Sequence, residues 1–349
     1  VRNAESIWRS HASRAARTMT LLAKSPGRGG LSLAAHTMHV VETIVPFSEA
    51  VGMDADIARQ GALLHDLGKA HPFFQAYLRG QADPNDPMAD PHRHEVSSLL
   101  LLPLFPRVIW PDLVEMVVAH HKSVRDERGL GELIRWSGNE AVFERHAEGF
   151  DEWGPAAAEI CYPSGIRQKE VSLKEAREAF EFAVNRVRSV KNGWSRNRGL
   201  LMMADHFASA FEGLAPNMAR RLFRQPDLNP FDGRENALYP LSLLRADQSE
   251  PHTLLIAPCG SGKTDYLIRR CRGRVFYVLP FQASINAMHE RFRDTFREAG
   301  LDVDVRKLHA ASTLNQKREG EDTALQRHPG AAIKVLTPHQ LASLAFGTA

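Results

Sequence analysis

The sequence has few cysteines, no long apolar run and almost no excess of one charge. Cys161, Cys259 and Cys271 are too few and too scattered for a disulfide framework or a cysteine-based zinc site, and they favour a reducing cytoplasm. No apolar run is long enough to span a bilayer, and the first residues do not form a secretory signal. The formal net charge of +3 permits nucleic-acid binding but does not indicate it. What is left is an ordinary globular protein, and its 349 residues predict roughly two domains.

The apolar spacing changes along the chain and predicts a mainly α-helical part followed by an α/β part. Helix-like spacing covers residues 31–45, 55–67, 96–102, 113–121, 173–190 and 200–211. From Pro251 onward, short apolar runs alternate with helical spacing, which predicts a parallel sheet. The expected strands are 253–256, 274–279, 303–308 and 332–336, with a long helix over 282–299. We expect one domain at 1–213, a proline-rich linker at 214–250 and a second domain at 251–349.

The most informative local feature is an adjacent histidine and aspartate, His65 and Asp66, which end an apolar helical segment and precede Gly68 and Lys69. Neighbouring side chains on a helix point about 100° apart, so both face one target only if it is large or doubled, such as a pair of metal ions. The alternative is a helix end, with the histidine near the last carbonyls and the glycine as the stop. This segment alone supports both interpretations equally.

Further histidines and aspartates occur in apolar helical segments of the same domain: His36, His94, His120, His121 and Asp205. Each has a structural explanation when it is taken singly. His36 is replaceable by His39 on spacing alone, the paired histidines suit a helix end, and Asp205 can pair with an arginine such as Arg198. Together they predict one site. Imidazole and carboxylate without thiolate favour iron, manganese, nickel or cobalt, and two such ions would clamp the oxygens of a phosphate.

These segments resemble the HD superfamily of metal-dependent phosphohydrolases and, more closely, the HD nuclease domain of the CRISPR-associated type I nuclease/helicase family. The resemblance is carried by His36, His65-Asp66-Leu67-Gly68-Lys69, Pro72-Phe73-Phe74-Gln75, His94-Glu95, His120-His121, and Asp205 with Ser209. The chain departs from the family at Lys122 and His206, where the family often has a small residue and a tryptophan.

The resemblance implies a two-metal site with a shared carboxylate. One ion would be held by His36, His65, Asp66 and Asp205, and the other by Asp66, His94, His120 and His121. It also implies catalytic roles for Asp66, His65 and Lys69, and DNA contacts from Lys69 and Ser209.

Residues 255–264, Leu-Ile-Ala-Pro-Cys-Gly-Ser-Gly-Lys-Thr, predict a phosphate loop, because a strand leads through a glycine-rich turn into a helix. The expected nucleotide-binding residues are Gly260, Ser261, Gly262, Lys263 and Thr264. Lys263 would contact the β- and γ-phosphates of Mg-ATP, and Thr264 would bind the magnesium. Ala257 stands where the general pattern has glycine, which resembles motif I of superfamily-two helicases.

Two later segments resemble the DNA-contacting elements of the same helicases, 279–291 and 335–340. They imply contacts from Gln282 and Thr337 to the DNA backbone, which would hold a strand without reading its sequence. No Asp-Glu pair follows Thr264 and a second RecA-like domain is missing, so we expect part of a first RecA-like domain.

The resemblance implies a divalent-metal-dependent nuclease for single-stranded DNA. It would be part of an ATP-driven helicase/nuclease that is recruited to a guide-RNA surveillance complex of the Cascade type, in the cytoplasm and without a membrane partner. Two alternatives stay open. One is an HD phosphohydrolase for nucleotides or cyclic dinucleotides, against which the phosphate loop argues. The other is a catalytically inert, metal-stabilised module that binds DNA or protein.

Overall fold

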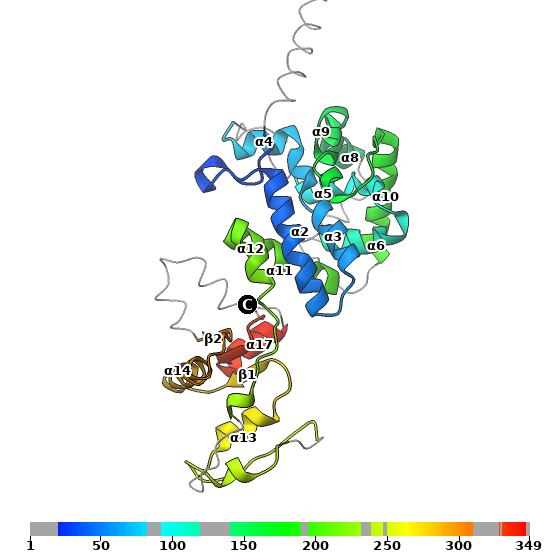
Figure 1. Ribbon diagram of the computed structural model, residues 1–349. Coiled ribbons are helices and arrows are strands. Elements are labelled where there is room, and N and C mark those ends of the chain that lie inside the picture. Colours follow the sequence, from blue (N-terminus) through cyan, green and yellow to red (C-terminus); the bar gives the residue numbers. More distant parts are fainter. Residues whose placement is uncertain are drawn as a thin grey trace, which may run out of the picture. The chain divides into compact units, whose positions relative to one another are not determined.

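The computed structural model describes residues 20–81, 92–118, 140–189, 195–231, 239–246, 250–309, 328 and 330–346, and the chain divides into two compact units (Figure 1). The first is Val1–Ala219 and the second Arg220–Ala349. The first unit is helical and the second contains a parallel sheet, so the expected fold class is confirmed. Within the described ranges, no helix combines the length and the apolar character that crossing a membrane requires.

The first unit is built from helices that pack mainly through α2 and α11. Its helices are α2 (Leu33–Ala50), α3 (Ala55–Leu64), α4 (Pro72–Leu78), α5 (His94–Leu99), α6 (Trp110–Val117), α8 (Glu140–Ala147), α9 (Phe150–Ala158), α10 (Leu173–Ser189), α11 (Arg196–Phe211) and α12 (Ala215–Ala219). α2 packs against α3 and α11, and α6 packs against the same two helices. Leu33, Val40 and Ile44, the predicted apolar face of α2, are fully buried.

The helix that precedes the dyad is shorter than the 55–67 expected from the sequence. α3 begins at an Asp54 cap, whose Oδ1 accepts hydrogen bonds from the backbone nitrogens of Asp56 and Ile57, and it ends at Leu64. Asp66 leaves helical geometry, with φ −113° and ψ 2°, and the 3-10 turn η2 (Leu67–Ala70) follows. The chain therefore changes direction at the dyad, and both side chains are buried.

The second unit contains three parallel strands in the order β1-β3-β2. Its elements are η7 (Asn229–Phe231), η8 (Pro240–Leu243), α13 (Lys263–Arg270), β1 (Val275–Val278), α14 (Gln282–Glu298), β2 (Val305–Leu308), β3 (Ile333–Leu336) and α17 (Pro338–Phe346). Ile333 pairs with Val275 on one side and with Val305 on the other. The buried Ile285, Phe292 and Phe296 of α14 belong to one core cluster with Ile333 and Val335. Three of the four expected strands and the long helix are thus confirmed.

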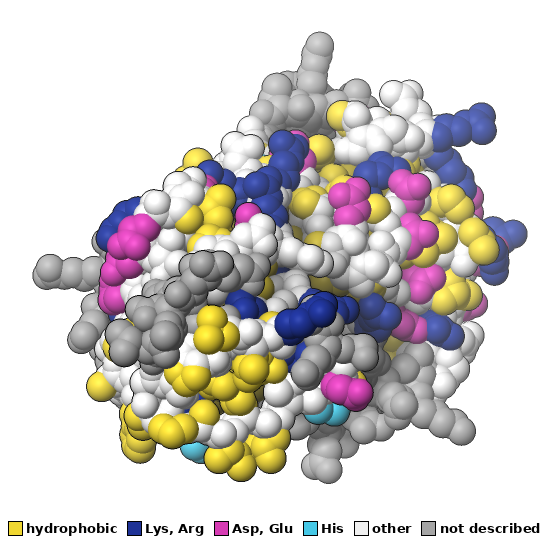
Figure 2. All heavy atoms as spheres, turned by 60° about the horizontal axis from the view of Figure 1, so that its bottom comes forward, with side chains coloured by type: hydrophobic (Ala, Val, Ile, Leu, Met, Phe, Trp, Pro, Cys, Tyr) yellow, Lys and Arg dark blue, Asp and Glu magenta, His cyan; other side chains and the backbone are white. Residues whose placement is uncertain are grey.

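The fourth expected strand, 253–256, is wrong. This segment precedes the phosphate loop but belongs to no strand, and Leu254 and Ile256 are each 88% exposed. The face drawn in Figure 2 carries exposed hydrophobic side chains in several places. A strand needs hydrogen-bonding partners on a neighbouring chain segment, and the described residues pair no segment with 253–256. Its apolar composition alone does not make it a strand.

Candidate metal centre and phosphate loop

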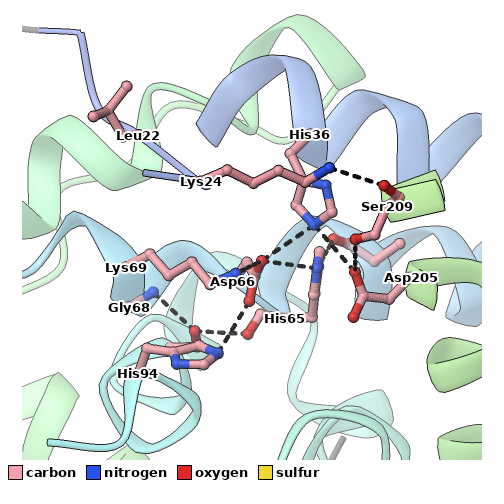
Figure 3. Close-up of polar contacts among 12 residues, drawn as sticks. Leu22, Lys24, His36, His65, Asp66, Gly68, Lys69, His94, Asp205 and Ser209 are labelled. Carbon is pink, nitrogen blue, oxygen red and sulfur yellow. Dashed lines mark hydrogen bonds and ion pairs between the residues drawn. The ribbon is translucent and has the colours of Figure 1, made fainter. Parts of the chain in front are cut away.

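The carboxylate of Asp66 lies at the middle of a buried cluster of histidines (Figure 3). Its Oδ2 is 3.3 Å from Nε2 of His36 and 3.3 Å from Nε2 of His65. Its Oδ1 is 3.2 Å from Nε2 of His94. The two oxygens of one side chain therefore have different histidine neighbours, from α2 and the end of α3 on one side and from α5 on the other.

His36 lies between two carboxylates. Its Nε2 is 3.1 Å from Oδ1 of Asp205 as well as 3.3 Å from Asp66. Burial by itself would lower the pKa of His36, but hydrogen bonds to Asp205 and Asp66 outweigh it and raise the pKa from 6.5 to about 9. Burial would likewise raise the pKa of Asp205, yet its bond to His36 holds that pKa below the usual range. Without a metal ion, a proton on His36 compensates part of the buried negative charge.

Groups outside the cluster lie beside the second ring nitrogens of His65 and His94. Nδ1 of His65 is 2.6 Å from the carbonyl oxygen of Ala62, which leaves Nε2 for the centre. Nδ1 of His94 is 3.7 Å from Oε2 of Glu95, and the guanidinium of Arg93 donates to the other oxygen of that carboxylate at 3.1 Å. A carbonyl partner such as that of His65 fixes the tautomer and raises the basicity of a histidine that binds a metal. The Glu95 carboxylate at 3.7 Å is an electrostatic neighbour of His94 and not a hydrogen-bond partner.

The donor set fits a divalent transition metal. His36, His65 and Asp205 each offer one ligand atom, these atoms lie within 4.8 Å of one another, and all three residues are buried. Imidazole nitrogens with carboxylate oxygens are ligands for iron, manganese, nickel and cobalt as well as zinc. A bound cation would also compensate the negative charge of the buried carboxylates, since unpaired charges are costly in the interior. The chain can therefore hold a cation here.

The structure selects among the histidines that the sequence left open. His36 joins the cluster, whereas His39, also on α2, is only half-buried and is not one of the converging ligands. Asp205 pairs with His36, and its Oδ1 also accepts a hydrogen bond from the Ser209 hydroxyl at 3.4 Å. His120 and His121, predicted for the second ion, lie outside the described residues.

Two lysines lie near the cluster, and the sequence predicted only one of them. Nζ of Lys69 donates to Oδ2 of Asp66 at 2.6 Å. Nζ of Lys24 donates to the carbonyl oxygen of Ser209 at 2.9 Å and to Oε1 of Glu212 at 2.8 Å. No local pattern marks Lys24, because it lies in an irregular segment before α2, and its two partners, Ser209 and Glu212, are distant in sequence.

That irregular segment is anchored by Gln75 on α4. The side-chain amide of Gln75 donates to the carbonyl oxygen of Leu22 at 2.9 Å, and its Oε1 accepts from the Leu22 nitrogen at 2.9 Å. Its Nε2 also donates to the carbonyl oxygen of Lys69 at 2.7 Å. One buried glutamine therefore connects the turn after the dyad to the segment that carries Lys24.

The segment predicted to be a phosphate loop has the expected glycine turn and leads into α13, although the described residues before it form no strand. Gly260 and Gly262 have φ of 78° and 87°, the left-handed region that glycine adopts without strain. Nζ of Lys263 donates to the carbonyl oxygens of Ala257 and Pro258 at 2.7 and 2.6 Å. Ser261 donates to Pro258, and the hydroxyl of Thr264 is 3.4 Å from that of Tyr277. The five predicted nucleotide-binding residues thus form one loop and the start of one helix.

The two predicted DNA contacts of this unit lie at element ends. Gln282 is exposed and is the first residue of α14. Thr337 follows β3 and is half-buried, and its hydroxyl accepts a hydrogen bond from the backbone nitrogen of Gln340 at 3.3 Å. Thr337 therefore caps the start of α17, a structural role that the sequence did not indicate.

Comparison with known proteins gives one family match and several similar structures. Residues 33–161 match the HD domain model, a range that includes the dyad, His36 and His94 but not Asp205. The crystal structure of T. fusca Cas3-ATP is similar to the chain, with 16% identity over 92% of this chain and 43% of that one and a TM-score of 0.49. The crystal structure of T. fusca Cas3 has 18% identity, coverage of 93% and 43%, and a TM-score of 0.45. The chain spans less than half the length of these proteins.

Proposed function

We propose that this HD-domain chain is a divalent-metal-dependent nuclease that hydrolyses phosphodiesters of single-stranded DNA. The observation that carries the proposal is the position of Asp66, with Oδ2 beside His36 and His65 and Oδ1 beside His94. A carboxylate with histidines on both sides is suited to share its oxygens between two ions. The phosphate loop in the same chain favours a nucleic-acid enzyme over a phosphohydrolase for free nucleotides.

The proposed ligand sets divide at Asp66. His36, His65, Asp66 and Asp205 would hold one ion, and Asp66, His94, His120 and His121 would hold the other. When bound, the ions would supply Lewis-acid chemistry, lowering the pKa of water and neutralising charge on the phosphate.

The remaining chemistry falls to the side chains around the proposed ligands. Lys69, whose ammonium group contacts Asp66, is the proposed cation for the incoming phosphate. Ser209 is proposed to contact the strand and, through its hydroxyl, to hold the carboxylate of Asp205.

We extend the proposal to the longer protein of which this chain would be a part. There, the phosphate loop would bind Mg-ATP through Gly260, Ser261, Gly262, Lys263 and Thr264, and Gln282 and Thr337 would contact the DNA backbone. ATP-driven movement would feed one strand to the HD centre after recruitment by a guide-RNA surveillance complex. These proposed roles are supported by the occurrence in one chain of a predicted phosphate loop, a helix whose first residue is a predicted DNA contact, and a candidate metal centre.

The test is cleavage of labelled single-stranded DNA by the purified chain with manganese, cobalt, nickel or iron. We expect cutting in the presence of at least one metal and its loss by a factor of at least about 100 in Asp66→Asn, because the bridging ligand loses its charge. Asp56→Asn is the matched control, since Asp56 is an exposed carboxylate on α3, the helix that precedes the dyad. It should cut like the wild type.

Other outcomes would replace the proposal. Release of phosphate from nucleotides or cyclic dinucleotides without strand cutting would favour the phosphohydrolase. Tight strand binding with bound metal but no turnover would identify an inert binding module. Cleavage that Asp66→Asn leaves undiminished would reject the metal centre as the site of reaction.

A further inference from the structure

One buried hydroxyl holds both ends of the turn that presents Asp66. Oγ of Ser98 donates to the carbonyl oxygen of His65 at 2.9 Å and accepts from the backbone nitrogen of Gly68 at 2.8 Å (the dashed line at the Gly68 nitrogen in Figure 3). Ser98 is fully buried on α5, one turn after His94. Asp66 lies between the two backbone groups, so a single side chain fixes the backbone on either side of it.

The turn and α5 approach each other through their backbones. A Cβ atom built on Gly68 would lie 2.0 Å from the carbonyl oxygen of His94 and 2.5 Å from the nitrogen of Ser98. Gly68 therefore lies close against the backbone of α5, and no side chain fits at this position. The Ser98 hydroxyl links this closely packed segment, which carries Asp66, to the helix that carries His94 by two hydrogen bonds.

We propose that Ser98 is a positioning residue for the metal centre, which sets the position of the Asp66 carboxylate relative to His94. The inference rests on the proposed metal site. Ser98 touches neither ligand side chain in this role; it acts through the backbone of His65 and Gly68. Because metal affinity depends on ligand positions to within a few tenths of an ångström, loss of the hydroxyl should weaken binding by about 10- to 100-fold.

The chain offers a matched control one residue earlier. Ser97 is on the same helix and is equally buried, and its hydroxyl also has hydrogen-bond partners. Those partners are Nε2 of His92, at 3.2 Å, and the carbonyl oxygen of His146, at 3.3 Å, neither of which belongs to the dyad turn. Ser97→Ala removes a buried serine hydroxyl of α5 but leaves the two hydrogen bonds of Ser98 to the dyad turn in place.

The experiment measures metal binding rather than activity. Metal-stripped wild type, Ser98→Ala and Ser97→Ala are titrated with Mn²⁺ and with Co²⁺, dissociation constants are obtained by competition with a chromogenic chelator, and Co²⁺ absorption spectra and Tm are recorded. We expect Ser98→Ala to bind 10- to 100-fold more weakly, with an altered Co²⁺ spectrum. Ser97→Ala should lower Tm by a similar amount while keeping the wild-type affinity and spectrum.

Two further variants keep the result interpretable. Ser98→Cys preserves the side-chain volume with a poor hydrogen-bonding group, so it should fold and still bind metal more weakly than the wild type, even if Ser98→Ala does not fold. Equal affinity in the wild type and both Ser98 variants would overturn the inference while Asp66→Asn still loses the metal. If wild type and Asp66→Asn bind metal equally, or neither binds it, the proposed function fails as well.

Discussion

The candidate site of the first unit is assembled from several helices, whereas that of the second unit is one continuous segment. In the first, the candidate ligands come from α2, the end of α3, α5 and α11, and they meet as buried side chains. In the second, the predicted phosphate loop is a run of consecutive residues, and its shape comes from glycines at positive φ and from hydrogen bonds of Lys263 to carbonyl oxygens of the same loop. A dispersed site depends on packing between helices, whereas a contiguous loop depends on local backbone geometry. Substitutions should therefore damage the two by different mechanisms.

The largest difference between the two units is expected when one methyl group is added at a glycine of each. Gly68→Ala should cost on the order of 3 kcal/mol and abolish metal binding, because its Cβ would meet the backbone of α5. Gly260→Ala meets no atom within 4 Å and should cost only about 1–2 kcal/mol, from its φ of 78°. Urea unfolding and metal titration of both variants measure the difference.

A third glycine serves as the control for that pair. Gly199 lies within α11 with nothing within 4 Å of an added Cβ, so Gly199→Ala should stabilise the protein by about 0.5–1 kcal/mol. Equal losses for Gly68→Ala and Gly260→Ala would show that close packing at the dyad is not what distinguishes the units.

The second prediction concerns protons, which the buried centre should exchange on metal binding. His36, with a pKa of about 9, carries a proton at neutral pH, and a metal ligand must be neutral imidazole. Metal affinity should therefore rise by about tenfold per pH unit while one proton is displaced, and level off above about pH 9. Calorimetry in buffers of different ionisation enthalpy counts the protons released.

The raised pKa of His36 also makes the stability of the metal-free protein depend on pH. In metal-free protein, the stabilisation from protonated His36 is complete below its unfolded pKa of 6.5 and is lost as the pH rises through about 9. A metal affinity that stays constant between pH 6 and 8 would contradict this account of the cluster.

The smallest effect is expected where the sequence predicted a strand that the structure lacks. Leu254→Ser and Ile256→Ser should each change the free energy of unfolding by no more than about 0.5 kcal/mol, because both side chains are already exposed. Val335→Ser, in the buried centre of β3, is the contrast and should be strongly destabilising. A large loss of stability in Ile256→Ser, measured by thermal unfolding, would indicate that 253–256 is a strand of the sheet after all.

Sequence patterns predicted what local chemistry determines. The apolar faces of α2, α10 and α11 and the glycine turn before α13 follow from spacing within one segment. α9 was missed because Gly154 and Pro155 interrupt its pattern, although its N-terminal half and the packing around Trp153 keep it helical. The prediction of a strand at 253–256 was wrong for the opposite reason. The composition suits a strand, but the described residues offer this segment no pairing partner.

The candidate site was predictable in its members but not in their support. The ligand types and the resemblance pointed to His36, the dyad, His94 and Asp205, and the structure brings these five side chains together. Ser98, Gln75 and Lys24 act through backbone groups distant in sequence, and their contacts become visible only when the helices are packed. Whether His120 and His121 complete the second ligand set stays a prediction.

The anchor made by Gln75 has a consequence for variation between related sequences. Its amide accepts a hydrogen bond from the backbone N–H of Leu22 and donates one to the backbone carbonyl of Leu22, as a neighbouring strand would. It therefore contacts the main chain and not the side chain. Many residue types at position 22 satisfy such a contact, whereas few side chains other than glutamine can make it from position 75. Over evolution, position 22 is therefore expected to drift while position 75 is retained.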